Sequence, residues 1–202
     1  KFAEASKTRL LCHTDGQLEV LQWLRENGCP WEEGTCSWAA QGGHLEVLQW
    51  ARANGCPWEE GTCWMAAKGG HLEVLQWARA NGCPWDEWTC TFAAKGGHLQ
   101  VFQWAIENAC PLDDKTLNIA AENGHEAVVH ALIQAGADFN KAFDIDNDDY
   151  DCDDYQRYDY DDGATPLYVA AQNGHAAVVR SLIKAGVDIN KARDIDNDDY
   201  ND

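Results

Sequence analysis

The sequence predicts an all-α solenoid of about six stacked helix pairs. One observation is a phrase at Gly42–Trp58 that occurs again, residue for residue, at Gly69–Trp85, with a looser copy at Gly96–Leu112. Each copy begins twenty-seven residues after the one before it, and each 27-residue unit holds two helix-forming segments separated by glycines. A fixed period of this length is typical of repeat proteins, in which every unit buries its apolar face against its neighbours.

Each 27-residue unit is predicted to contain a short first helix, a turn and a longer second helix. In one unit, small residues and helix formers follow Thr35, whose side chain is suited to capping the helix start. Gly42-Gly43 ends that helix, and His44 precedes apolar residues at helical spacing. Asn54-Gly55 ends the second helix, and Pro57 prevents its continuation. One such pair cannot bury its own apolar face, so we expect the pairs to stack.

Paired alanines set the register of the repeats. Counting one degenerate pair, the spacing is twenty-seven residues four times and then fifty residues. The registers are Cys12-His13, Ala39-Ala40, Ala66-Ala67, Ala93-Ala94, Ala120-Ala121 and Ala170-Ala171. We therefore expect a single repeat domain over residues 1–202. Its predicted parts are a degenerate repeat at 9–28, three 27-residue repeats at 29–109, a repeat at 110–140, an acidic insertion at 141–162, a repeat at 163–193 and a truncated acidic loop at 194–202.

The last two repeats carry a motif that is specific to one family. Residues Gly163–His175 read GATPLYVAAQNGH, and Ala177–Asn190 continue with a second helix and its exit. Residues Glu122–His125 and Ala135–Asn140 match parts of the same pattern. This motif closely resembles the ankyrin repeat signature, with Tyr168 in place of its usual His.

The resemblance covers about residues 9–193 and implies a protein-binding scaffold. The 27-residue repeats depart from the usual 33-residue unit, because six residues are missing between Gly55 and Thr62. We expect this deletion to remove the β-hairpin finger of those repeats. Short hairpin-like finger loops are therefore expected only in the C-terminal part of the chain.

Nine cysteines at regular spacing raise three interpretations: a metal site, disulfides or core packing. Three pairs are seven residues apart, and each is followed by a His eight residues later. These sets are Cys29, Cys36 and His44; Cys56, Cys63 and His71; and Cys83, Cys90 and His98. The internal alignment favours packing, because Leu117 and Ala137 occupy the equivalent positions in a later repeat. Reduced thiols indicate an intracellular compartment. Zinc ligation and disulfides within a unit stay open as alternatives.

The recurring tryptophans and histidines are also interpreted as structural. Two positions hold Trp in the 27-residue repeats, and Ala131 and Phe139 stand there in a later repeat. The first set is Trp23, Trp50, Trp77 and Trp104, and the second is Trp31, Trp58 and Trp85. We expect these rings to belong to the core, and not to a platform for nucleic-acid bases. A His opens each later second helix, so we expect it to serve the turn and not catalysis.

The charge is strongly acidic and unevenly spread. Formal net charge is −19, of which residues 1–137 carry −8 and residues 138–202 carry −11. An acidic surface repels phosphate, which argues against nucleic-acid binding, and it favours a basic protein partner or a cation. No apolar run approaches the roughly 20 residues that span a bilayer. We expect an intracellular, cytoplasmic chain that is a fragment or a processed product, and consider a subunit of a larger assembly.

Variable positions on the predicted first helices give the candidate protein-binding residues. In a solenoid the recurring residues pack and the remaining ones recognise partners. The candidates on or just before the first helices are Trp38, Trp64, Met65, Trp88, Phe92, Lys115 and Tyr168. The resemblance places the first helices on the concave face, where aromatic side chains would anchor a partner. For Trp64 the alternative is that it covers a neighbouring repeat, whereas Trp88 has Gly and Lys as its equivalents. Lys68 and Lys95 are among the polar residues expected at the rim.

The insertion is the second candidate region. The segment Asp138–Asp162 holds 11 Asp among 25 residues and stands where an ankyrin finger would be. The tyrosines Tyr155, Tyr158 and Tyr160 lie among these aspartates. Acidic and aromatic side chains together suit a basic protein surface, so we expect this loop to contact the partner.

Calcium is the alternative occupant of the acidic loops. Three Asp at alternate positions have the spacing of Ca²⁺ ligands, and they occur twice, as Asp144, Asp146 and Asp148 and as Asp194, Asp196 and Asp198. An EF-hand is not indicated, because Asp149 replaces the required Gly and Tyr155 replaces the required Glu. No other cofactor is predicted.

The sequence therefore predicts a non-catalytic protein–protein interaction scaffold that binds through its concave face and its acidic loop. The alternative is a Ca²⁺-binding or Ca²⁺-modulated structural or adaptor protein. An enzyme is not predicted, because the sequence shows no nucleophile paired with a base and no phosphate-binding glycine loop.

Overall fold

A computed structural model describes residues 17–32, 34–142 and 164–190. The described parts are helical, in agreement with the predicted fold class. The chain divides into two compact units, Lys1–Asp113 (unit 1) and Asp114–Asp202 (unit 2), and each is treated separately below. The boundary falls inside the predicted repeat at 110–140.

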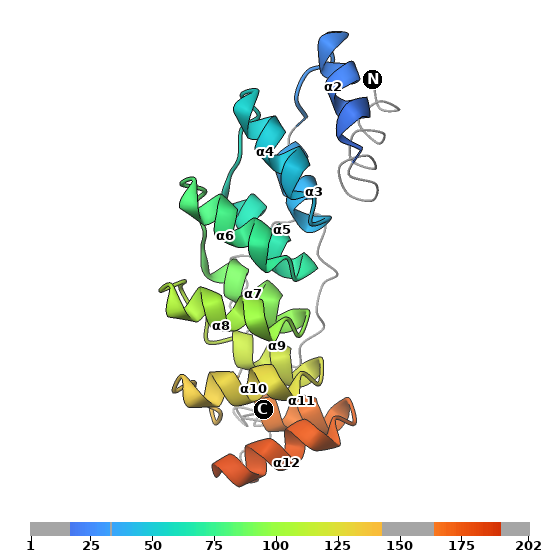
Figure 1. The fold of residues 1–202 in the computed structure, drawn as a ribbon. Helices are drawn as coiled ribbons and strands as arrows, with labels where there is room; N and C mark the ends of the chain where they lie inside the picture. Colours follow the sequence, from blue (N-terminus) through green and yellow to red (C-terminus); the bar gives the residue numbers. More distant parts are fainter. Residues whose placement is uncertain (1–16, 33, 143–163, 191–202) are drawn as a thin grey trace, which may run out of the picture. The chain divides into compact units, whose positions relative to one another are not determined.

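Unit 1 contains, in its described part, one isolated second helix and three complete helix pairs. Helix α2 spans Leu18–Glu26, and the pairs are α3 (Thr35–Gln41) with α4 (Leu45–Ala53), α5 (Glu60–Gly69) with α6 (Leu72–Ala80), and α7 (Glu87–Lys95) with α8 (Leu99–Glu107). The first helices α3, α5 and α7 contact one another in order, and each packs against the second helix of its own pair. Figure 1 shows this unit as two rows of helices.

Unit 2 repeats the arrangement with two described pairs. They are α9 (Thr116–Glu122) with α10 (Glu126–Gln134), and α11 (Pro166–Gln172) with α12 (Ala176–Ala185). The first helices α9 and α11 contact each other, as do the second helices α10 and α12. In every complete pair that the structure describes, the paired alanines lie on the first helix. The first helix of the degenerate N-terminal repeat and the expected finger loops at 143–162 lie outside the described residues.

The first helices, which stack on one another, carry fully buried small residues. In unit 1 the alanine pairs of α3, α5 and α7 have no exposed surface. The second helices contribute larger side chains, including Leu48, Leu75 and Phe102, which are also fully buried. A methyl side chain lets two helices approach closely, so the alanines set the distance at which each pair stacks on the next.

The prediction that Thr35 caps its helix is wrong, although Thr165 caps the first helix of a later repeat. The Thr165 hydroxyl accepts a hydrogen bond from the backbone N–H of Tyr168 at 3.3 Å, and Pro166 follows as the first helical residue. In α3 the Thr35 hydroxyl instead donates to the Glu32 carbonyl at 2.8 Å. Helices α5 and α7 begin two residues before their Thr, so the hydroxyl of Thr62 lies inside the stack, 3.3 Å from that of Ser37.

The structural interpretation of the histidines is confirmed. His71 Nε2 lies 3.0 Å from the carbonyl oxygen of Gln41, which ends the preceding first helix. His98 makes the same contact with Lys68 at 3.1 Å, and His175 makes it with Glu122 at 2.6 Å. Each ring therefore satisfies a helix-terminal carbonyl of the previous repeat. We call this contact the histidine clasp.

The glycine turns leave room for the histidine clasp. Gly43 has φ +75°, and a Cβ built on it would lie 2.5 Å from Nδ1 of His71. A Cβ at Gly69, in the next repeat, would lie 2.5 Å from Cδ2 of the same ring. The imidazole thus sits between two glycine turns, and a side chain on either glycine would displace it.

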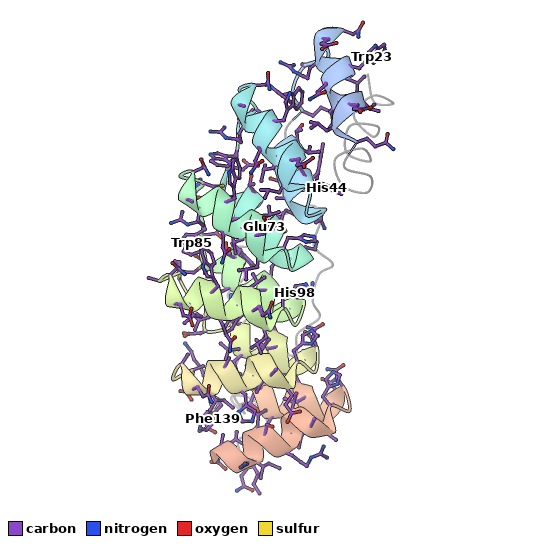
Figure 2. All side chains as sticks on the ribbon, in the orientation of Figure 1. Trp23, His44, Glu73, Trp85, His98 and Phe139 are labelled. Carbon is purple, nitrogen blue, oxygen red and sulfur yellow. The ribbon has the colours of Figure 1, made fainter. Side chains whose placement is uncertain are left out.

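The prediction that the recurring tryptophans belong to the core is wrong. Trp23 is 60% exposed, and the other six are half-buried. Within unit 1, Figure 2 shows Trp85 on one side of the row of second helices and His44 and His98 on the other. The tryptophan rings lie near the point where the chain leaves one second helix and approaches the next first helix. This part of each repeat faces solvent.

These tryptophans form an Arg–Trp–Trp clamp that recurs three times. Each link Trp meets a second-helix Trp edge-on: Trp31 with Trp50 at 5.5 Å, Trp58 with Trp77 at 5.7 Å and Trp85 with Trp104 at 5.7 Å. The guanidinium of Arg25, Arg52 or Arg79, on the preceding second helix, lies 4.1–4.3 Å from the centre of the link ring. The clamp joins consecutive second helices through the shortened link, where a longer ankyrin repeat has its finger.

Packing, the favoured interpretation of the cysteines, is confirmed for six of the seven that the structure describes. Cys36, Cys56, Cys63, Cys83, Cys90 and Cys110 are buried, whereas Cys29 is half-buried. All seven are free thiols. Among the residues placed in the structure, no group of three or more His, Cys, Asp or Glu side chains is arranged to hold a metal ion.

The glycine turn yields a stability prediction with an internal control. Gly43→Ala and Gly55→Ala both place a side chain at positive φ, but nothing lies within 4 Å of the new Cβ at position 55. We expect Gly55→Ala to lower the free energy of unfolding by about 1–2 kcal/mol. Gly43→Ala should cost roughly 1–3 kcal/mol more, because it displaces His71 from the Gln41 carbonyl. Urea unfolding measures both values, and equal losses would contradict the histidine clasp.

The clasp also predicts a pH dependence of stability. Burial lowers the pKa of His71 below its ordinary value, and the hydrogen bond to the Gln41 carbonyl only partly offsets this. The folded state favours the neutral ring of His71. The contribution of this ring to stability is therefore complete above its unfolded pKa of about 6.5, and it is lost as the pH falls from there toward the folded pKa.

Replacing His71 by Gln should therefore flatten the loss of stability between about pH 7 and about pH 5.5. His130, on the exposed surface of α10, provides the control His130→Gln. Urea midpoints measured across this pH range give the slopes. A slope for His71→Gln as steep as that of the original chain would refute the assignment.

Candidate functional site

An aromatic cluster lies on the first helices of unit 1. Trp64 of α5 stacks on Phe92 of α7, with ring centroids 5.0 Å apart and planes inclined by 28°. Trp88, also on α7, lies 6.0 Å from the same ring. Phe92 is 3% exposed, whereas both tryptophans are half-buried. We call Trp64, Phe92 and Trp88 the aromatic cluster.

The cluster has a structural role as well as an exposed edge. The ring of Trp64 belongs to one repeat and covers Phe92 of the next, so the alternative interpretation of Trp64 as a cover for its neighbour is supported. Lys68 places its ammonium group 5.7 Å from the centre of the Phe92 ring. The structure therefore brings together three of the predicted candidates, and Phe92 itself is a buried support.

Trp38 and Met65 are half-buried on α3 and α5. Trp38 lies close to the turn before its helix, since a Cβ at Gly34 would be 3.2 Å from its Cε2 atom. In unit 2, Lys115 directly precedes α9 and Tyr168 is on α11, and both are half-buried. Tyr155, Tyr158, Tyr160 and all six candidate Ca²⁺ ligands lie outside the described residues.

Acidic pairs precede the first helices, and the sequence analysis did not single them out. They are Glu32-Glu33, Glu59-Glu60, Asp86-Glu87 and Asp113-Asp114, one pair in each of four consecutive repeats. The internal alignment of the repeats, which shows the recurring cysteines and tryptophans, also shows that these acidic pairs recur. Two of the pairs, Glu59-Glu60 and Asp86-Glu87, flank the helices that carry the aromatic cluster.

The acidic pairs and the aromatic residues meet at the start of α5. A Cβ at Gly61 would lie 3.5 Å from Nε1 of Trp64 and 3.6 Å from Cγ of Glu59. The indole N–H edge and the acidic side chain therefore border the same glycine. This position provides an aromatic surface and a negative charge side by side.

Asp86 lies in a crowded group of negative charges. Burial, and then the charges of Glu87 and Glu60, raise the pKa of Asp86 above its ordinary value. One carboxylate oxygen, Oδ1, is buried and has no hydrogen-bond partner among the described residues. A cation placed near Asp86 would offset the repulsion from Glu87 and Glu60.

Comparison with known families decides the fold family. A family model for ankyrin repeats in three copies matches residues 63–143, and one for a single ankyrin repeat matches residues 162–195. Together these matches cover more than half of the chain. The chain belongs to the ankyrin repeat family. The resemblance seen in the sequence is thus confirmed, and ankyrin repeats generally mediate protein–protein interactions.

Solved structures support the same fold. Of the 270 chains that match, one is the crystal structure of the human ASB11 ankyrin repeat domain. That structure has 18% sequence identity to this chain and a TM-score of 0.66, and the alignment covers 90% of this chain and 84% of that chain. At this identity the likeness shows the fold alone. The comparison with curated proteins found no match.

The family matches begin at residue 63, but the ankyrin architecture starts earlier. The pair α3/α4 has the same helix order, alanine contact and glycine turn as the pair α5/α6. None of the described helices is both long enough and apolar enough to span a bilayer.

The packing of the Trp64 ring over Phe92 of the next repeat can be tested by removing the ring. Trp64→Ala should lower the free energy of unfolding by about 2 kcal/mol, because it exposes Phe92 and leaves a gap between two repeats. Trp23→Ala is the matched control, since that ring is 60% exposed, and it should change stability by no more than about 0.5 kcal/mol. Urea unfolding followed by circular dichroism compares the two, and a similar effect of both would contradict the role of Trp64.

Proposed function

We propose that this chain is a non-catalytic ankyrin scaffold that binds a basic protein segment on the first-helix face of unit 1. The observation that carries the proposal is the Asp86 carboxylate, which lies among other acidic side chains just before the helix that bears Trp88 and Phe92. An arginine or lysine of a partner would offset the negative charge that Asp86, Glu87 and Glu60 concentrate there.

The chemistry of the aromatic cluster supports the same partner. Guanidinium and ammonium groups are attracted to the faces of Trp rings, and the attraction grows when the contact excludes water. Trp88 is the proposed anchor, because its equivalents in other repeats are Gly34, Gly61 and Lys115 and no packing rule requires Trp there. Trp38 and Met65 are proposed to extend the contact along the first helices.

The charges along each first helix would orient the partner. Acidic pairs lie at the N-terminal ends of α5 and α7, and Lys68 and Lys95 lie at their C-terminal ends. A bound segment with a basic and an acidic end would therefore be favoured in one direction over the other. This arrangement limits the acceptable partners without requiring many specific hydrogen bonds.

The acidic insertion is proposed as a second contact with the same basic partner. Its support is the sequence alone: the Asp-rich composition and the tyrosines Tyr155, Tyr158 and Tyr160. Lys115 and Tyr168 in unit 2 remain proposed contacts of this region. Ca²⁺ binding by the Asp-rich loops remains the alternative, and it rests on the spacing of the aspartates. An intracellular location, and membership of a larger assembly, remain proposals.

Selection from displayed random peptides on the immobilised full chain tests the partner class. The selected peptides should be enriched in Arg and Lys, and the affinity of a chosen peptide should fall steeply with added salt. Trp88→Ala should weaken that peptide by about tenfold or more, as expected for a central aromatic anchor. Glu87→Gln should weaken it less, because it removes only one of several acidic charges.

Trp23→Ala again serves as the control, because Trp23 is exposed but stands on α2, away from the aromatic cluster in sequence. The affinity of this variant for the peptide should equal that of the unchanged chain. Enrichment of acidic peptides, or equal losses for Trp88→Ala and Trp23→Ala, would refute the proposed site.

A further inference from the structure

Four variable positions change together at one repeat boundary in unit 1. At the boundary between α3 and α5 they hold uncharged residues without an aromatic ring, whereas at the boundary between α5 and α7 they hold three aromatic rings and a lysine. Written with the equivalent residue twenty-seven positions earlier, they are Trp64 (Ser37), Lys68 (Gln41), Trp88 (Gly61) and Phe92 (Met65). The first helices stack at both boundaries, so stacking itself requires neither the lysine nor the rings.

The four residues form two pairs that meet between the helices. Trp64 and Lys68 are four residues apart on α5, and Trp88 and Phe92 are four residues apart on α7. Residues at this spacing are neighbours on one face of a helix. Phe92 is the common contact: its ring centre lies 5.0 Å from that of Trp64, 6.0 Å from that of Trp88 and 5.7 Å from the ammonium group of Lys68. Lys68 is therefore a cation that the chain itself supplies to the aromatic cluster.

The same face of α5 also carries a negative charge. Glu60, Trp64 and Lys68 follow one another at four-residue intervals, and a rise of about 1.5 Å per residue separates Glu60 from Lys68 by about 12 Å along the helix axis. Glu60 is exposed, and its charge is among those that act on Asp86 at the start of α7. The side of α5 next to α7 thus presents a negative group, an aromatic ring and a positive group in a row.

Given the proposed function of the first-helix face, on which this inference rests, we propose that Lys68 sets the specificity of the site. The site would select a partner segment with one basic and one acidic side chain over a segment with basic side chains alone. The basic side chain would lie near Trp88 and the acidic pairs, and the acidic one would lie at Lys68. Because an extended chain advances about 3.3 Å per residue, the two side chains would be roughly four residues apart in the partner.

Lys68 would act through both attraction and repulsion. A partner carboxylate would pair with the Lys68 ammonium group, whereas a second partner cation would meet a like charge and would have to displace Lys68 from the Phe92 ring. The net negative charge of the chain favours the opposite choice, because it attracts a segment with more basic residues more strongly. A preference for the mixed-charge segment would therefore report the local contact and not the net charge.

The combination of a lysine with a ring in the next repeat occurs at this boundary alone. At the other boundaries the equivalent combinations are Gln41 with Met65, Lys95 with Ile119 and Glu122 with Val169. Lys95 has the same place on α7 and the same charge as Lys68 on α5, but no aromatic residue stands at the matching position of the repeat that follows it. Lys95→Gln is accordingly the matched control for Lys68→Gln.

The test is a competition between two displayed peptide libraries on the immobilised full chain at about 0.15 M salt, where long-range attraction is screened. Both libraries carry a fixed Arg in random sequence. The mixed-charge library has a fixed Glu four positions away on either side, and the all-basic library has a second fixed Arg there. Sequencing of the recovered peptides gives the ratio of mixed-charge to all-basic segments.

On the unchanged chain we expect this ratio to exceed that of the starting mixture by about tenfold. On Lys68→Gln it should fall to the starting ratio or below, whereas Lys68→Arg, which retains the charge, and Lys95→Gln should keep the preference. Glutamine occurs at the equivalent positions Gln41 and Gln172, so Lys68→Gln should fold, and circular dichroism verifies this for each variant. A merely structural role of Lys68 would lower the melting midpoint of Lys68→Gln without changing the ratio.

Failure of this inference and failure of the proposed function give different results. If neither library is recovered above the level seen with Trp88→Ala, the first-helix face does not bind basic segments, and both are refuted. If peptides are recovered through Trp88 but without a preference for the mixed-charge library, or if Lys68→Gln leaves the ratio unchanged, only the role of Lys68 is refuted. An equal fall of the ratio for Lys95→Gln would also refute that role, since any nearby positive charge would then suffice.

Discussion

The close stacking of neighbouring first helices, each with a buried alanine pair, is the constraint on which the rest of the structure depends. Ala39-Ala40, Ala66-Ala67 and Ala93-Ala94 are completely buried in unit 1, and no larger side chain would allow the same approach. Because the first helices stack this closely, the bulkier side chains of the second helices fill the layer behind them. The turns, links and surface residues follow from that spacing.

Two recurring contacts hold the edges of the stack in unit 1. The histidine clasp joins the turn of one repeat to the second helix of the next, and the Arg–Trp–Trp clamp joins consecutive second helices through the link. Both use side chains of fixed identity in the 27-residue repeats. Because these contacts lie at the edges of the stack, a position on the first-helix side can vary between repeats, as it does from Gly34 and Gly61 to Trp88.

The internal alignment predicted which residues are equivalent, but it could not say how far each one is buried. It assigned the cysteines to packing correctly, since substitution by Leu or Ala reveals an apolar position. The same reasoning failed for Trp31 and Trp50, because an edge-on aromatic pair with a stacked guanidinium is stable at a half-exposed position. The capping role predicted for Thr35 is wrong because Gly34 holds the N-cap position and Thr35 is already the first helical residue. The acidic pairs were visible in the alignment and were overlooked.

The sequence by itself determined the fold class, the repeat period, the family and the acidic character of the chain, because these depend on periodicity and composition along the chain. Only the tertiary structure decided which side chains meet. His71 meets the carbonyl of Gln41 in the previous repeat, Trp64 covers a ring in the next repeat, and the charge of Glu60 acts on Asp86 of the repeat that follows it. These contacts depend on how one repeat is placed on the next, and that placement is set by packing between helices and not by any local sequence preference.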